Sequence, residues 1–286
     1  MEASGKRWIE YGSRTDEFRL WNICDIHWGA RACAERHLRE TVQTIADDPF
    51  SFWFSSGDYG DFIGRSDKRF CPSGPAEWLK IADLGNIGKV IADSLLKELM
   101  PIKDKCLGFG YGNHDLKFME SSDNTDIHGY LCTMLGVPSL AYSGFFDLVF
   151  CRLGRIRKPR LHWTQPAAGS TRRAVRVCYH HGAGYAITPG GKLNRLLQFM
   201  RQNEADVYMT GHVHSKIFHD DTILAADESC GRLVERVRWG AVSGAYLKAY
   251  DQGHTTYAEI KMYQPTTLGA AAVSICPNTG AIKPYH

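Results

Sequence analysis

Apolar runs with the lengths of strands and helices alternate along the first 111 residues, and this alternation constrains the fold more than any other feature. Buried strands are predicted for Phe18 to Ile26, Phe50 to Ser55 and Cys106 to Tyr111. Helical spacing of apolar residues separates them, over Ala30 to Ala46 and about Ala76 to Leu99. Strands that alternate with helices in this way favour a layered α/β architecture.

The rest of the chain continues the alternation and then becomes richer in strands. The elements expected next are a helix near Ile127 to Leu135, strands near Tyr142 to Leu153 and Ala174 to His180, a helix from Lys192 to Gln202 and a strand from Asp206 to Thr210. Between residues 216 and 282, apolar and polar residues alternate between turns, which predicts mainly antiparallel strands. No linker divides the chain, so residues 1–286 are expected to form one domain, with a loop insertion at 59–75 and a basic flap at about 152–176.

Five short polar stretches follow predicted strands. In chain order they are Asp25-Ile26-His27, Gly57-Asp58-Tyr59-Gly60-Asp61, Gly112-Asn113-His114-Asp115, His180-His181-Gly182 and Gly211-His212-Val213-His214. Open α/β sheets place their ligands at the carboxyl ends of strands. Each stretch alone also fits a polar turn, or a strand-end histidine with a structural partner. All five in this order make coincidence remote and indicate a metal site.

The series DxH, GDxxD, GNHD, HHG and GHxH resembles the calcineurin-like metallophosphoesterases over residues 25–214. The resemblance implies a four-layer α/β/β/α sandwich of two mixed sheets flanked by helices, with two metal ions at its apex. The metal ligands that it implies are Asp25, His27, Asp58, Asn113, His181, His212 and His214. In this pattern Asp58 bridges the two ions, and His180 is the alternative to His181.

Two further motif residues are implied to act in catalysis. The resemblance puts His114 at the leaving-group or phosphate oxygen and Asp61 behind it, where the carboxylate would orient the imidazole. An imidazole in this position could protonate the departing alkoxide, a role that contributes about 10²–10⁴-fold. Pairing with a carboxylate would fix its tautomer and favour the imidazolium form.

A dinuclear centre meets the chemical demands of phosphoester hydrolysis. The ester is anionic and repels hydroxide, so two metal ions help by clamping the phosphoryl group and acidifying a bridging water. Mixed Asp, Asn and His ligation suits Mn²⁺, the ion we expect, as well as Fe or Zn²⁺, better than Mg²⁺ or Ca²⁺. The predicted activity is hydrolysis of a phosphodiester, in nucleotides or nucleic acid, by metal-activated hydroxide.

Three other interpretations stay open. A phosphomonoesterase acting on a small phosphate would fit if the 59–75 loop and the basic flap close over the site. A non-catalytic, polyanion-binding member of the fold would keep the shape without the chemistry. A nucleic-acid-binding module with structural metals would bind in a salt-sensitive manner without turnover.

Cations near the motifs suggest how an anionic substrate is held. In the phosphoprotein phosphatases an arginine directly follows the GDxxD motif, but Phe62 stands there in this chain, which argues against that class. Arg65, Lys68 and Arg69 follow in the same loop and are the candidate substrate-binding residues. A solvated, charged loop fits these three residues as well.

The region from Leu148 to Asn203 is strongly basic, in a chain whose net charge is only +3. It has no Asp or Glu and eleven cations: Arg152, Arg155, Arg157, Lys158, Arg160, Arg172, Arg173, Arg176, Lys192, Arg195 and Arg201. With Trp163 available for base stacking, the flap could bind a polyanion. Keeping an exposed insertion soluble is the alternative role.

Cysteine usage and the N-terminus bear on location. The nine cysteines are odd in number and form no CxxC pair, so neither a disulfide framework nor a zinc ribbon is expected. Residues 1–17 have no apolar signal core, and no run approaches the roughly 18 apolar residues of a membrane span. The sequence therefore predicts a cytoplasmic protein that does not bind membranes.

Overall fold

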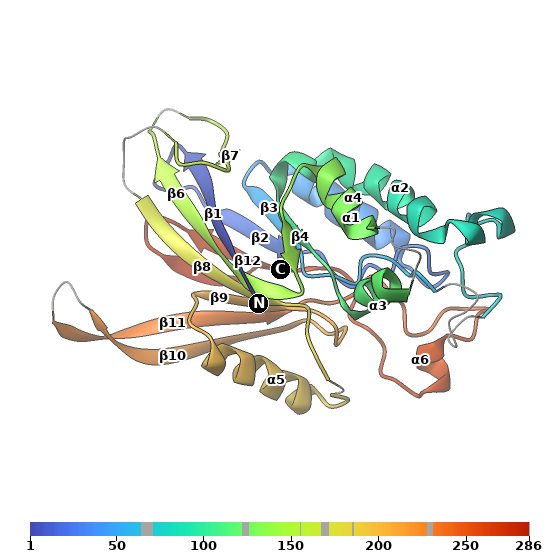
Figure 1. The fold of residues 1–286 in the computed structure, drawn as a ribbon. Coiled ribbons are helices and arrows are strands. Elements are labelled where there is room, and N and C mark those ends of the chain that lie inside the picture. The colour runs from blue at the N-terminus through green and yellow to red at the C-terminus, as the bar shows by residue number, and fades with distance from the viewer. Residues whose placement is uncertain are drawn as a thin grey trace.

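Two mixed β-sheets form the centre of the structure (Figure 1). The computed structural model describes residues 1–63, 71–121, 126–154, 156–166, 172–184, 186–227 and 231–285. The seven-stranded sheet has the order β10 (Ile217–Asp227), β11 (Arg232–Val242), β9 (Val207–Thr210), β8 (Arg172–His180), β6 (Ser143–Arg152), β1 (Glu2–Tyr11) and β7 (Arg160–His162). The six-stranded sheet has the order β13 (Ala281–Tyr285), β12 (Ala271–Cys276), β2 (Phe18–Asn22), β3 (Ser51–Ser55), β4 (Cys106–Gly110) and β5 (Ser139–Ala141).

Helices cover both outer faces of this pair of sheets (Figure 1). On the six-stranded sheet lie α1 (Glu35–Asp47), α2 (Ile87–Leu99) and α4 (Ile127–Leu135), and on the seven-stranded sheet lies α5 (Pro189–Gln202). The remaining helices are α3 (Asn113–Ser121), α6 (Tyr257–Ile260) and two 3₁₀ turns, Ile81–Gly85 and Met100–Lys105. The order of layers is helix, sheet, sheet, helix, as expected.

The alternation of buried side chains explains this layering. In β3 all five residues are buried, because the strand is covered on both faces. Phe52 and Phe54 belong to the core between the sheets, whereas Trp53 belongs to the core under the helices. On α1 the buried Leu38, Val42 and Ile45 recur at helical spacing and form the stripe that packs on the sheet.

Most expected elements are present, with shifted ends. The first expected strand stops at Asn22, four residues early, so Asp25 and His27 lie in a loop. The expected helix from Ala76 is only a 3₁₀ turn followed by α2. Between residues 243 and 270 the antiparallel strands are absent from the described chain, which has isolated bridges and α6 there instead. In that segment, period-two alternation alone did not indicate sheet pairing.

Strand direction decides what lies at each end of the sandwich. Strands β6 and β8 are antiparallel, and Ser143 pairs with His180 while Cys151 pairs with Arg172. At about 3.3 Å per residue, these two pairs are separated by roughly 25 Å along the strands. The end of the sandwich where β8 and β9 finish is called the carboxyl end. The end where β6 finishes is called the opposite end.

None of the helices in the described part of the chain is both long and apolar enough to cross a membrane.

Candidate metal centre

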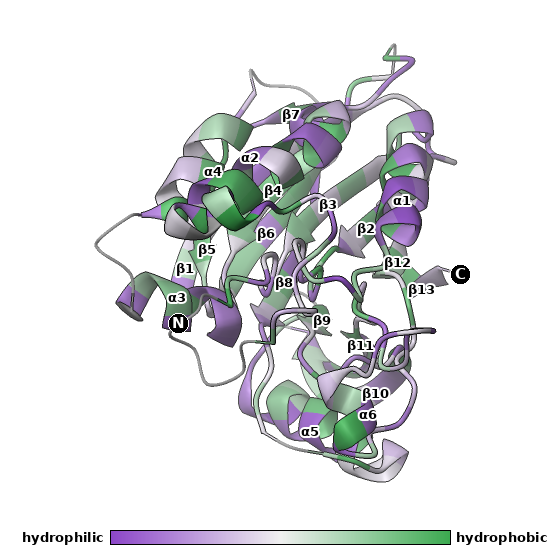
Figure 2. Cartoon of the chain, turned by 90° about the vertical axis from the view of Figure 1, so that its right-hand side faces the viewer, coloured by the Kyte–Doolittle hydropathy of each residue, from purple (hydrophilic) through white to green (hydrophobic). Residues whose placement is uncertain are grey.

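The five polar stretches meet at the carboxyl end, and backbone hydrogen bonds tie them together. Asp25 N–H donates to the Gly57 carbonyl over 2.9 Å, and Gly211 N–H donates to the His181 carbonyl over 2.9 Å. His212 N–H in turn donates to the Asp25 carboxylate. Figure 2 looks onto this end of the molecule, with α3 and α1 on either side and α6 below. Residues far apart in the sequence thus become neighbours here.

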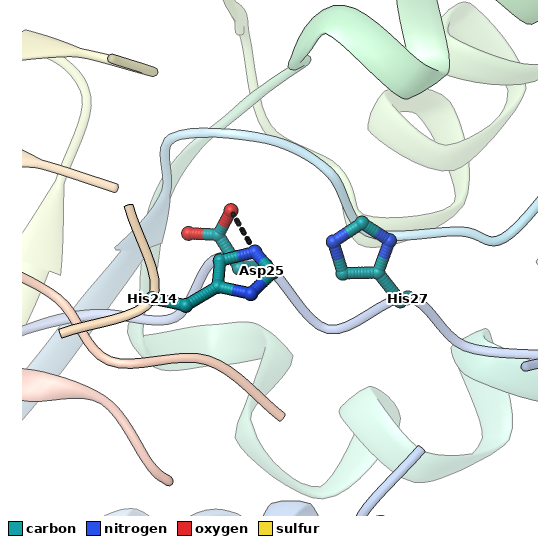
Figure 3. Close-up of side chains that lie close together, drawn as sticks. All are labelled: Asp25, His27 and His214. Carbon is teal, nitrogen blue, oxygen red and sulfur yellow. Dashed lines mark ion pairs between the residues drawn. The ribbon is translucent and has the colours of Figure 1, made fainter. Parts of the chain in front are cut away.

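The first group of candidate ligands is Asp25, His27 and His214, whose ligand atoms all lie within 4.8 Å of one another. His214 Nε2 is 3.4 Å from Asp25 Oδ1, the ion pair drawn in Figure 3. Asp25 and His27 are buried, and the His214 side chain is 22% exposed. One side of this group is therefore open to solvent.

The second group is Asp58, His181 and His212, again within 4.8 Å of one another. His181 Nε2 lies 3.2 Å from Asp58 Oδ2 and 3.1 Å from Asn113 Oδ1. The same Asp58 oxygen is 3.9 Å from His27 Nε2, a member of the first group. Asp58 therefore stands between the two groups, where a bridging carboxylate is needed.

The structure distinguishes the two histidines of the HHG stretch. The fully buried His181 side chain points to Asp58 and Asn113, while His180 Nδ1 accepts the N–H of Gly182 over 2.8 Å. The ring of His180 lies against Tyr142 and Phe199, away from the two groups. Neighbouring strand residues face opposite sides of a sheet, which explains the difference.

His114 and Asp61 form a third group together with His27, with all ligand atoms within 4.8 Å. His114 is the second residue of α3, is partly exposed, and its ring centre is 4.8 Å from that of His27. Its backbone N–H donates to Asp58 Oδ1 over 2.9 Å. The side chain is thus within reach of a group bound at the centre.

Backbone strain gathers at the centre. Seven non-glycine residues of the described chain have positive φ, and five of them are candidate ligands: Asp25, His27, Asp58, His212 and His214. This region of φ/ψ space is unfavourable for residues with a Cβ and persists only where the surroundings impose it. Each of the five values lies between 49° and 71°, in the left-handed region.

Two glycines allow the turns after β3 and β4 to touch. A Cβ on Gly57, where φ is +113°, would lie 2.1 Å from Gly112 N. A Cβ on Gly112 would lie 2.2 Å from Asp58 Oδ1 and 2.5 Å from His181 Cε1. Any side chain at these positions would push the two groups apart.

Asp115 is a part of the site to which sequence reasoning assigned no role. Its buried Oδ2 accepts the N–H of Asp58 at 2.6 Å and the N–H of Gly112 at 2.8 Å, and so joins the turns after β3 and β4. Burial, and then the charge of Asp58, raise the pKa of Asp115 to about 8. The sequence feature that could have identified Asp115 is its place directly after His114 in the GNHD stretch.

Burial and neighbouring charges shift the pKa values of the clustered carboxylates and imidazoles. Burial, together with the charge of His114, lowers the pKa of His27 to about 3, so its ring is neutral. Burial opposes ionisation of Asp25, but the hydrogen bond and charge of His214 lower the pKa of Asp25 to about 2. Burial likewise opposes charge on His181, yet the charge and hydrogen bond of Asp58 raise its pKa to about 9.

Whether these residues fit a metal ion can be judged from the surroundings of the His27 ring. Both of its ring nitrogens are buried and have no hydrogen-bond partner. A buried polar atom without a partner costs about 1–3 kcal/mol, so an orphaned neutral imidazole beside carboxylates calls for an explanation. A divalent cation accepting the imidazole lone pair is one that the surrounding Asp and His donors fit.

The three candidate substrate-binding residues belong to the 59–75 loop. Arg65, Lys68 and Arg69 lie outside the described residues. Phe62, in the position where the phosphoprotein phosphatases have arginine, is buried and stacks on Phe118 at 4.7 Å, so it supports α3.

The basic flap lies at the opposite end of the sandwich (Figure 1). Its central residues Arg160–His162 form β7 and pair with β1, and residues 172–176 are the start of β8. Trp163 is 43% exposed and lies under the guanidinium of Arg7 at 5.4 Å. The described part of the flap therefore does not cover the metal centre.

Comparisons with known proteins find likeness in fold only. No protein-family model matches the chain, and no curated protein matches it significantly. Among solved structures, Vps29 complexed with Zn²⁺ from Entamoeba histolytica is 10% identical, with 94% of this chain and 97% of that chain covered and a TM-score of 0.39. A metallophosphoesterase from Sphaerobacter thermophilus is 12% identical, with 94% and 89% covered and a TM-score of 0.36.

A third match is the NAD nucleotidase of Haemophilus influenzae, which is 10% identical, with 95% of this chain but only 49% of that chain covered and a TM-score of 0.40. All three are distant. The order of layers and the meeting of the five motifs at one end are observed directly in this chain. In fold as well as in motif, the chain resembles the calcineurin-like metallophosphoesterases.

Proposed function

We propose that the protein is a dinuclear metal-dependent phosphoesterase that hydrolyses phosphodiester bonds, in nucleotides or nucleic acid. The observation that carries the proposal is His27, a buried imidazole with two partnerless nitrogens between the carboxylates of Asp25 and Asp58. A phosphate-binding surface alone would not need a neutral, orphaned imidazole. A metal site does, because a ligating imidazole must be deprotonated.

Seven residues would hold the two ions. Asp25, His27 and His214 would bind one, Asn113, His181 and His212 the other, and Asp58 would bind both. Two divalent ions so held would neutralise charge on a phosphoryl group and supply a nucleophile by lowering the pKa of water. The donor set favours Mn²⁺, with Fe or Zn²⁺ as alternatives.

Residues of the chain itself would carry out proton transfer to the leaving group. His114, within 4.8 Å of Asp61 and His27, would donate a proton to the departing ester oxygen. Asp61 would hold the imidazole in orientation and favour its protonated form. Asp115, by accepting N–H groups of both turns, would keep Asp58 and the GNHD stretch in register.

The open side of the centre supports a diester over a monoester. His114, His212 and His214 stay partly exposed, and the described part of the basic flap lies at the other end. Both ester arms of a diester could therefore leave the centre. The eight cysteines in the described ranges are free thiols, which supports the cytoplasm as the proposed compartment.

Turnover by the metal-stripped protein with added Mn²⁺ tests the proposal. Bis(4-nitrophenyl) phosphate should be cleaved faster than 4-nitrophenyl phosphate, and neither should be cleaved without metal. Faster cleavage of the monoester would replace the diester assignment with a phosphomonoesterase. If two ions bind and neither ester is cleaved with Mn²⁺, Fe²⁺ or Zn²⁺, the protein is a binding member of the fold.

A further inference from the structure

Asp25 belongs to the first ligand group, and a buried thiol holds its carboxylate on the side away from that group. Cys24 is fully buried, and its Sγ donates to Asp25 Oδ2 over 2.9 Å. The backbone N–H of His212 donates to the same oxygen over 2.9 Å and to Asp25 Oδ1 over 3.1 Å. Oδ2 therefore has two donors, one from a side chain and one from the backbone.

The other oxygen of Asp25 faces the first ligand group. Oδ1 is 3.4 Å from His214 Nε2, and Figure 3 shows the second carboxylate oxygen pointing away from both imidazoles. Asp58 is arranged in the same way, since its Oδ1 accepts the N–H of His114 while its Oδ2 faces His181. In each carboxylate, one oxygen faces hydrogen-bond donors of the protein and the other faces imidazoles, where a metal ion would lie.

The turn after β9 packs directly against the thiol and the carboxylate. A Cβ on Gly211 would lie 2.5 Å from Asp25 Oδ2 and 2.6 Å from Cys24 Sγ. The backbone of Asp25 is fixed as well, because its N–H donates to the Gly57 carbonyl and its carbonyl accepts the N–H of Tyr246. The two donors to Oδ2 then set the direction of the carboxylate, and the thiol is the one that a substitution can remove.

We propose that Cys24 is a positioning residue for the first ion, the ion that the first ligand group would hold. Its thiol binds Asp25 Oδ2, so that Oδ1 is presented to this ion. The inference rests on the proposed function and makes it more specific, because the thiol contacts a ligand of the first ion alone. The S–H group is a weak donor, so it directs the carboxylate and leaves most of the negative charge for the ion.

Calorimetric titration of the metal-stripped protein with Mn²⁺ tests this role, and two single-ion backgrounds identify the ion that is affected. His214→Ala removes a ligand of the first ion, and His212→Ala removes a ligand of the second but keeps the backbone N–H. In the His212→Ala background, Cys24→Ala should lower the affinity of the remaining ion by about 10–100-fold. In the His214→Ala background, the same change should alter the affinity of the remaining ion less than about twofold.

Two further variants separate the hydrogen bond from packing. Cys24→Ser differs from Cys24→Ala by a hydroxyl donor and should restore most of the lost affinity. The matched control is Cys106→Ala, which removes a buried thiol at the start of β4 and should leave both affinities unchanged. An equal loss in both backgrounds, no loss in either, or the same loss in Cys24→Ser would overturn the positioning role.

The titration also separates this role from the chemistry. The expected pattern of affinities without hydrolysis of either ester would refute the proposed function and leave the role of Cys24 standing. Absence of Mn²⁺ binding by the unmodified protein would overturn both.

Discussion

The two ends of the sandwich use the same residue types in opposite ways. At the opposite end His162 Nε2 lies 3.0 Å from Glu10 Oε2, Arg172 lies over the ring of Trp8, and Arg152 contacts Asn278. At the carboxyl end both nitrogens of His27 lack partners. Cations and imidazoles with partners stabilise a sheet edge, whereas an imidazole left without partners is free to bind a ligand.

Backbone geometry follows the same division. Five candidate ligands at the carboxyl end have positive φ, while at the opposite end the described residues with positive φ are glycines, such as Gly154 and Gly280. Strain of this kind costs of order 1–3 kcal/mol per residue and is kept at functional sites. The two ends can therefore be compared by substitution.

Asp58→Asn should have the largest effect. Asp58 Oδ2 faces both ligand groups, so loss of its charge should weaken binding of both ions. The loss should exceed the about 10–100-fold in metal affinity that removal of a supporting partner costs. Metal analysis after dialysis checks this, and two retained ions would contradict the bridging role.

His114→Ala should leave both ions in place and lower turnover by about 10²–10⁴-fold, most for substrates with poor leaving groups. The matched control is His162→Ala, which removes an imidazole at the opposite end. Steady-state rates across leaving groups of different pKa measure the effect. Equal losses for good and poor leaving groups would remove His114 from the acid role.

Asp115→Asn tests positioning rather than ligation. In the amide one of the two acceptor oxygens is replaced by an NH2 donor, so backbone N–H groups of the Asp58 turn lose an acceptor and the turn should loosen. Metal affinity should fall by about 10–100-fold, as for other groups that orient ligands. Titration with Mn²⁺ measures this, and the maximal rate at saturating metal should recover substantially. A rate that does not recover would mean that Asp115 acts in the chemistry itself.

Acid should destabilise the core behind the centre through His128. Burial lowers the pKa of His128 to about 4, below its unfolded value of 6.5. The stabilisation from its neutral form is therefore complete above pH 6.5 and is lost as the pH falls toward 4. Between pH 7 and pH 5 the loss should be about 1–2 kcal/mol. Urea unfolding of the protein and of His128→Phe at both pH values checks this. The same pH dependence in both proteins would exclude His128 as its source.

The smallest effect is expected at the opposite end. Arg157 and Lys158 are exposed and far from the centre. Their double substitution by Gln should change metal affinity and mononucleotide turnover less than about twofold, because distant exposed charges are screened by salt. A larger change, measured at 0.15 M salt, would mean that the flap contributes to the active site after all.

Much of the fold was accessible from local pattern. The alternation of apolar runs predicted the α/β layers, and the five polar stretches predicted which residues meet at the carboxyl end. Strand β1, which lies beside the edge strand β7, was not predicted, because its buried residues Arg7 to Tyr11 mix charged with apolar side chains and show no period-two alternation. Its place beside β6 comes from long-range pairing.

What local pattern determines is residue type and order along each element, since turns, strand alternation and motif spacing are short-range properties. The antiparallel arrangement of β6 and β8 is set by the tertiary structure. It places the basic flap about a strand length away from the metal centre. Pairing partners are tertiary as well: only the folded chain gives Asp115 its N–H donors, faces His181 toward Asp58 and leaves the ring nitrogens of His27 without hydrogen-bond partners. The chemistry of a charged or polar side chain depends on those partners, and they come from distant parts of the sequence.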